Sequence, residues 1–314
     1  MKFKHTKTLS GIILFSVLFF SCSNDEKDIF QEEELVKVNI RAGISTSSYD
    51  AEWAANDAIG IAMLDYQQRS IIDNIYNYRY YTPSGSESFI PSSADQVLYY
   101  PWNGARVYFK AYYPYLANLS PDMTFPVSVE DQSDLPAIDV MTGSHLSGFS
   151  RVDPDADLRM YHRLSKLIFR FTYGEGLEGL PGTDYDVIIH GMKITGVCDI
   201  LNDIVHVENN VKDIYVPDRG LEKQTTGIVM PRPAGRGVTF DFSFTGGRVF
   251  EAAMSDTLQL LSGHKYTFYI RLEASGDPGP GPGPGPGPDP EVATIFRVDI
   301  EDWIAGPDSW IVAQ

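Results

Sequence analysis

Apolar and polar side chains alternate with a period of two along much of this chain, and this pattern predicts β-strands. In KLIFRFTYGE, for example, Leu167, Phe169 and Phe171 occupy every second position. The strand-like runs are short, turn signals separate them, and no stretch combines sustained helical periodicity with capping residues. We therefore expect an all-β chain built from β-sandwiches.

Two sandwich domains in tandem fit the length of 314 residues, although one large sandwich would also fit it. A region rich in Pro, Ser and Asp covers residues 120–158, and a second series of strands follows it. We place the N-terminal sandwich at residues 35–158 and the C-terminal sandwich at residues 159–275.

The N-terminus carries the features of an export signal. Three lysines precede an apolar run, residues 9–20, which is too short to span a bilayer comfortably. The small Ser21 followed by Cys22 resembles the end of a lipoprotein signal peptide. We therefore expect removal of residues 1–21 and acylation of Cys22, with a plain secretory signal as the alternative.

Residues 22–34 form an acidic tether. Its run SNDEKD resembles the export signal that sends lipoproteins of some Gram-negative anaerobes to the outer face of the outer membrane. We therefore expect a cell-surface protein that is attached to the outer membrane through its lipid anchor. The net charge of −17 argues against a nucleic-acid partner.

A Gly-Pro spacer, residues 276–290, separates the last strand-like segment, residues 291–314, from the strands before it. Alternating Gly and Pro cannot build a strand, because every Pro removes a backbone donor, and Pro-rich spacers stay extended. The segment after the spacer should have one apolar face that needs a core to cover it. It therefore either folds back into this protein's own sandwich or enters that of another subunit as a donor strand. The residues of that face are Val292, Thr294, Phe296, Val298 and Ile300.

One group of carboxylates has the spacing of a calcium loop. Asp153, Asp155 and Asp157 fit that pattern, but Leu158 and Leu164 occupy the positions that need Gly and Glu. A solvated linker is the simpler interpretation, and we expect no metal and no cofactor.

Two reactive residue types are also interpreted as structural. Cys198 lies in an apolar run and is expected to be a buried small hydrophobe rather than a nucleophile. His162 is expected to be a packed or capping residue rather than a catalyst. The chain lacks the common nucleophile, phosphate-loop and zinc-peptidase motifs, so we do not expect an enzyme.

A tyrosine-rich stretch offers a different kind of site. Tyr76, Tyr78 and Tyr80 alternate, with Tyr81 on the opposite face. Exposed aromatic rings stack on sugars, which makes these residues a candidate glycan platform. The alternative is a sandwich face with the tyrosine hydroxyls at its rim.

Five longer motifs occur in order along the chain. They are EWAANDAIGIAML (52–64), YYPWNGARVYFKAYYPY (99–115), HRLSKLIFRF (162–171), LLSGHKYTFYIRL (260–272) and IEDW (300–303). In series they resemble the motifs of bacterial fimbrillins, over nearly the whole chain that follows the signal peptide. The Gly-Pro spacer before IEDW departs from the usual pattern.

This resemblance implies two transthyretin-like β-sandwich domains in a fimbrial subunit, anchor or tip component with a role in adhesion. It also implies that a trypsin-like protease removes the first strand and that a neighbouring subunit's terminal strand fills the groove, a form of β-augmentation. Arg41 is our candidate cleavage point, with an ordinary strand arginine as the alternative. The partners would then be other fimbrial subunits. The alternative function is a monomeric surface lipoprotein adhesin that binds host or bacterial glycans or proteins through the tyrosine-rich face.

Overall fold

The computed structural model describes most of the chain after the predicted tether. The described residues are 35–44, 52–67, 69–144, 148–174, 177, 185–218, 225–244, 247–273, 291–303 and 311–312. The predicted signal peptide, the acidic tether with Cys22 and the Gly-Pro spacer lie outside them. In the part that is described, no helix has both the length and the apolar character to cross a bilayer.

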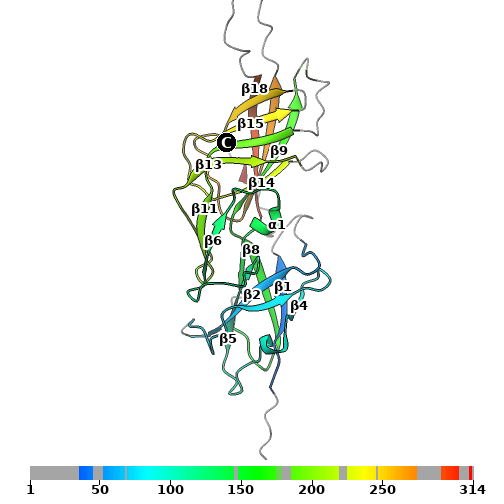
Figure 1. The fold of residues 1–314 in the computed structure, drawn as a ribbon, viewed down its shortest axis with the longest axis vertical. Helices are drawn as coiled ribbons and strands as arrows, with labels where there is room; N and C mark the ends of the chain where they lie inside the picture. The colour runs from blue at the N-terminus through cyan, green and yellow to red at the C-terminus, as the bar shows by residue number, and fades with distance from the viewer. Residues whose placement is uncertain are drawn as a thin grey trace, which may run out of the picture. The chain divides into compact units, whose positions relative to one another are not determined.

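The structure is almost entirely β, as the alternation predicts, with only the short helices η1 (Ala94–Gln96) and α1 (Leu135–Ile138) in the described residues. Seven strands from the first half of the chain close into a barrel in the order β1-β4-β3-β2-β5-β7-β8 (Figure 1). Their bounds are β1 Asn39–Ile44, β2 Ala58–Asp65, β3 Tyr78–Tyr81, β4 Ser88–Pro91, β5 Val107–Tyr113, β7 Met141–Ser144 and β8 Asp155–His162. Closure leaves this sheet without a free edge.

The second half of the chain forms a large sheet with the order β13-β10-β15-β16-β18-β17-β9-β14. A short final strand, β19 (Ile311–Val312), pairs with β18 outside this order. The other strands are β9 Ser165–Tyr173, β10 Tyr185–Lys193, β13 Val211–Val216, β14 Thr225–Val229, β15 Thr239–Phe244, β16 Arg248–Ala253, β17 His264–Glu273 and β18 Glu291–Asp302. Most of the alternating run that begins at residue 166 lies in β9, next to β17.

A third, three-stranded sheet joins the two halves of the sequence. It consists of β12 (Ile204–Val207), β11 (Thr195–Asp199) and β6 (Thr124–Ser128), in that order. β6 comes from the region expected to be a soft connection, and its Pro126 is tolerated because β6 is an edge strand. Residues 35–158 therefore contribute one strand, β6, to a sheet whose other two strands come from the second half of the chain. The expected boundary at residue 158 falls inside β8, and residues 35–314 form one compact unit.

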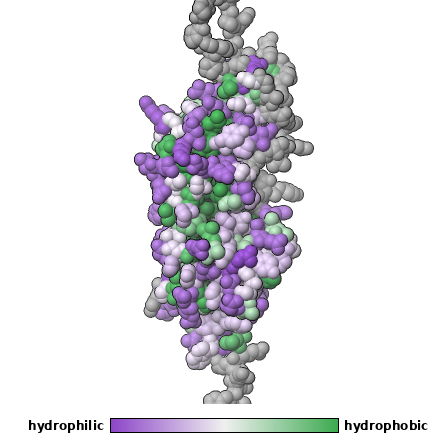
Figure 2. Space-filling model, in the orientation of Figure 1, coloured by the Kyte–Doolittle hydropathy of each residue, from purple (hydrophilic) through white to green (hydrophobic). Residues whose placement is uncertain are grey.

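Two clusters of buried side chains fill this unit. One lies inside the barrel and includes Ile40, Ile59 and Phe109. The other packs the second half, and it also takes in Leu64 and Tyr112 from β2 and β5, so it reaches the outer face of the barrel. On the face seen in Figure 2, hydrophilic residues cover most of the described surface, and hydrophobic residues gather in its middle.

Candidate functional site

The first strand of the barrel is the element that the sequence predicts to be removed. β1 pairs antiparallel with β4 at Ile40 and Arg41, and parallel with β8 along its whole length. The inward side chains of Ile40 and Ala42, with Val38 just before the strand, are buried, and Ile44 at its end is partly buried. β1 is therefore one wall of the barrel, and both of its backbone edges are paired.

Trp53 ties β1 to the rest of the barrel. Its Nε1 donates a hydrogen bond of 2.7 Å to the carbonyl oxygen of Ala42 on β1. The indole meets the rings of Phe89 and Tyr113 edge to face, with centroids 5.1 and 5.4 Å away. Asp57 fixes this corner, because its carboxylate accepts from the backbone N of Ala54 and from the hydroxyl of Tyr113. The Trp and Asp of the 52–64 motif thus hold the first strand.

Arg41 lies on the outer face of β1, and its side chain is 55% exposed. Its guanidinium is 3.2 Å from Glu87 on one side and 3.3 Å from Asp157 on the other. No sequence pattern predicts either of these partners. A protease could reach this side chain. The peptide bond after it lies in the middle of a strand that is paired on both sides, so cleavage in the folded protein would require β1 to detach first. Cleavage at Arg41 stays a prediction.

The last long strand occupies the interior of the chain's own sheet. β18 pairs antiparallel with β17 from Val292 to Asp302 and parallel with β16 at Glu291 and Val292. Of the two alternatives for this segment, folding back and donation, the structure therefore has the first. A donated state stays a prediction.

The apolar face of β18 differs from the expected one because of a β-bulge. Arg297 pairs with Tyr269, but the next pair is Ile295 with Ile270, so Phe296 is an extra residue. One extra residue reverses which side chains face inward. The core face is therefore Ala293, Ile295, Val298 and Ile300, whereas Thr294 is exposed and Phe296 is 55% exposed. The side chain of Val292 lies outside the described residues.

Trp303, at the end of β18, is buried against the start of the second half. Its backbone N donates to the carbonyl oxygen of Gly263, and its ring stacks on His162 with centroids 3.8 Å apart. His162 is itself held by Asp139, whose Oδ1 lies 2.8 Å from Nδ1. His162 is thus a packed residue, as expected, and the stack links the closing IEDW motif to the motif that begins at residue 162.

The tyrosine-rich stretch does not present its rings as one exposed face. Tyr80 is 1% exposed, its hydroxyl accepts from the backbone N of Leu98, and burial raises the pKa of Tyr80 to about 12. Tyr76 and Tyr78 pack against the two buried clusters, and Tyr81 is partly buried. Tyr78 and Tyr80 thus belong to the cluster inside the barrel and Tyr76 packs against the other cluster, so these three rings do not form one exposed row. Glycan binding by this stretch stays a prediction.

Metal and thiol chemistry find no support in the described residues. No group of three or more His, Cys, Asp or Glu side chains is gathered there as a metal site would require, and Asp153, Asp155 and Asp157 are part of no such group. Cys198 is fully buried, and burial raises the pKa of its thiol to about 12. A thiol that stays protonated at neutral pH is a poor nucleophile.

Comparisons with known proteins agree with this architecture. The model of the family described as fimbrillin-like matches residues 45–303. A protein of Bacteroides uniformis named "Putative fimbrium subunit Fim1C" is 28% identical over 280 residues, which is 84% of this chain and 89% of that protein. Two crystal structures of proteins described as a "putative cell adhesion protein" are similar. The one from Bacteroides uniformis has a TM-score of 0.67 and 23% identity, and covers 85% of this chain and 98% of its own. The one from Bacteroides ovatus has a TM-score of 0.66 and 17% identity, and covers 87% and 99%. At these identities the two structures show a shared fold.

Proposed function

This chain belongs to the fimbrillin-like family, and we propose on that basis that it is a structural subunit, or an anchor or tip component, of a bacterial cell-surface fimbria. Its similarity to a fimbrium subunit, over 89% of that protein, supports this assignment. The relatives described as cell adhesion proteins support a role in adhesion. Its partners would be other fimbrial subunits.

The observation that carries the assembly mechanism is the position of β1 between β4 and β8. Cleavage after Arg41 would remove the first half of this strand, Asn39 to Arg41, and would leave its partners on β4 and β8 unpaired beside the inward sites of Val38 and Ile40. Unpaired edges beside an apolar groove favour the addition of another strand. A strand from a neighbouring subunit would restore the backbone hydrogen bonds, and its alternate side chains would fill the vacated sites.

The donor would come from residues 291–314 of the neighbour. β18 is joined to β17 along the whole length of β17, whereas β19 is joined to β18 at two residues, Ile311 and Val312. The part beyond Trp303 can therefore separate with the smallest loss of pairing. An exchange that also included Val292 to Ile300 would have to break the ladder with β17, which the smaller exchange leaves in place.

Processing and anchoring complete the proposal. A trypsin-like protease would cut after Arg41 once β1 detaches, so the assembled subunit would begin at Ala42. Before that step, a lipid on Cys22 would hold the protein to the outer membrane at the cell surface, through the tether of residues 22–34. A subunit that keeps this anchor would serve as the attachment of the fimbria rather than as part of its shaft.

The proposal is tested by limited trypsin digestion of the purified chain without its signal peptide. Uncleaved protein should be monomeric by light scattering, and protein cleaved to begin at Ala42 should form ladders that resist sodium dodecyl sulfate. Arg41→Gln should stay monomeric under the same digestion. Assembly of Arg41→Gln to the same extent as the parent chain would disprove a requirement for cleavage at this residue.

A further inference from the structure

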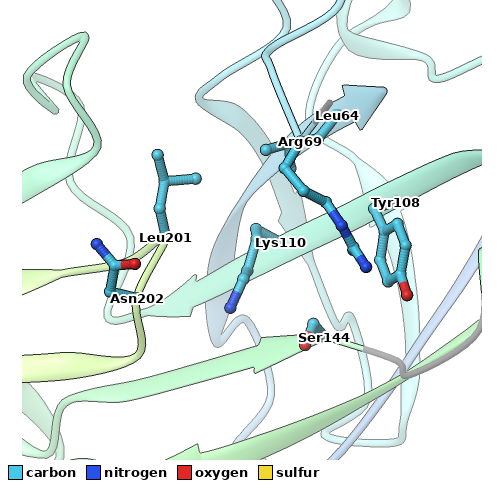
Figure 3. A pocket seen from close by; sticks show the side chains of 7 residues that line it. All are labelled: Leu64, Arg69, Tyr108, Lys110, Ser144, Leu201 and Asn202. Atoms are coloured by element: carbon cyan, nitrogen blue, oxygen red, sulfur yellow. The ribbon is translucent and has the colours of Figure 1, made fainter. Parts of the chain in front are cut away.

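A cavity of about 570 Å³ lies where the barrel meets the turn that follows β11. Four separate parts of the chain build it: the end of β2 with the turn after it, β5, β7, and the β11–β12 turn (Figure 3). The volume is in the range of small-molecule sites. The described residues that line it are Leu64, Arg69, Tyr108, Lys110, Ser144, Leu201 and Asn202.

Arg69 is held in place by its backbone and by aromatic rings. Its φ of 58° is in the left-handed region, which is uncommon for a residue other than glycine, and its backbone N donates to the carbonyl oxygen of Asp65. Its guanidinium carbon lies 3.1 Å from the centroid of Tyr108, and Tyr66 stacks on Tyr108 with centroids 5.1 Å apart. A guanidinium that stacks on an aromatic ring still directs its N–H donors outward in its own plane, where they form a fork that a ligand can approach.

The charge of Arg69 is not neutralised within the described residues, where it takes part in no ion pair. Asp203, in the β11–β12 turn, is already shared. It lies 2.5 Å from Lys110 Nζ and 3.2 Å from Arg163, and it accepts a hydrogen bond of 2.6 Å from the hydroxyl of Thr142. Among the described residues that line the cavity, two are cations, Arg69 and Lys110, and none is a carboxylate, in a chain whose net charge is −17.

The remaining lining is mixed. Ser144 and Asn202 supply a hydroxyl and an amide, and Leu64 and Leu201 supply apolar walls (Figure 3). A guanidinium fork matches the geometry of a carboxylate, small polar groups match hydroxyls, and leucines match the C–H face of a sugar ring. We propose that this cavity binds an acidic sugar, a uronate or a sialate, with its carboxylate on Arg69. This proposal goes beyond fimbrial assembly and does not depend on strand exchange.

The test is a titration of the full chain without its signal peptide by calorimetry, with glucuronate, N-acetylneuraminate and glucose as the probes. At least one of the two acids should bind, and glucose, which lacks the carboxylate, should bind at least tenfold more weakly. Binding should weaken as salt is added, because ionic attraction at an accessible site is screened. No binding of either acid at millimolar concentration, or equal binding of glucose, would overturn the proposal.

Substitutions distinguish binding at Arg69 from a general attraction of the acid to positive charge on the surface. Arg69→Gln should weaken binding of the acid at least tenfold, and Arg69→Lys, which keeps the charge but loses the fork, should also weaken it. The matched control is Arg79→Gln, because Arg79 lies over Tyr81 at 5.6 Å and does not line the cavity. Equal losses in Arg69→Gln and Arg79→Gln would overturn the site. Tighter binding of a triglutamate peptide than of either sugar acid would overturn the ligand class.

Discussion

The hydrogen bond from Trp53 to the first strand offers a direct way to change how readily β1 leaves the barrel. Trp53→Phe removes the Nε1–H donor, which lies 2.7 Å from the carbonyl oxygen of Ala42, and keeps most of the aromatic packing with Phe89 and Tyr113. A buried hydrogen bond contributes about 1 kcal/mol net. The free energy of detaching β1 should fall by this amount, so the detached population should rise roughly fivefold.

Cleavage after Arg41 reports that population. When opening and closing are fast relative to proteolysis, the rate of cleavage follows the fraction of open molecules. Mass spectrometry of a limited trypsin digest should therefore show the product that begins at Ala42 forming roughly fivefold faster in Trp53→Phe than in the parent chain. Trp102→Phe is the control, because Trp102 is 70% exposed and should leave the rate unchanged.

Two results would refute this reasoning. If Trp53→Phe were cleaved at the parent rate, the bond to Ala42 would not limit the release of β1. If Trp102→Phe showed the same acceleration, the effect would come from a general loss of stability rather than from the first strand.

Three further predictions address side-chain packing and one pair of ionic contacts in both halves of the chain. Trp303→Ala should lower stability by about 3–5 kcal/mol and the melting temperature by roughly 10 °C, because it empties a buried site stacked on His162; a calorimetric shift below about 2 °C would contradict the packing. Gly60→Ala should cost about 1–3 kcal/mol in chemical denaturation, since a Cβ there would overlap the ring of Tyr112, and an unchanged midpoint would contradict this contact. Burial lowers the pKa of His190, but the hydrogen bonds and charges of its two aspartate partners on β13 and β15 outweigh burial and raise the pKa above 6.5. A raised folded-state pKa stabilises the protein below 6.5 and loses that contribution as the pH rises through the folded value, so His190→Asn should lower the melting temperature more at pH 5.5 than at pH 8.5; an equal drop at both would contradict it.

Period-two alternation predicted the all-β fold class and many of the strands, because a strand with one buried face has apolar side chains at every second position. It did not reveal the bulge at Phe296, because one inserted residue reverses the inward face without altering the sequence pattern on either side. For the same reason, alternation alone did not tell whether the face of Tyr78 and Tyr80 would point to solvent or to the barrel interior.

Features that depend on contacts between residues far apart in the chain could not be predicted from the sequence. β6 pairs with β11, about seventy residues later, so the Pro-rich region around Pro126 was interpreted as a connection. The cavity that contains Arg69 draws on residues as far along as Asn202, and none of the motifs includes both. The motif residues Trp53, Asp57 and Trp303 were recognisable as a pattern, but their roles in holding β1 and closing the second sheet required the contacts.

Strand exchange, the central claim, is tested most directly by comparing two chains that have both been cleaved after Arg41: the full chain and one that ends at Trp303. The shorter chain keeps β18 and its stack on His162, so its melting temperature before cleavage should equal that of the full chain. Light scattering should then show the cleaved full chain as a series of oligomers and the cleaved shorter chain as a monomer. Assembly of both chains to the same size, or of neither, would contradict a donor strand beyond Trp303.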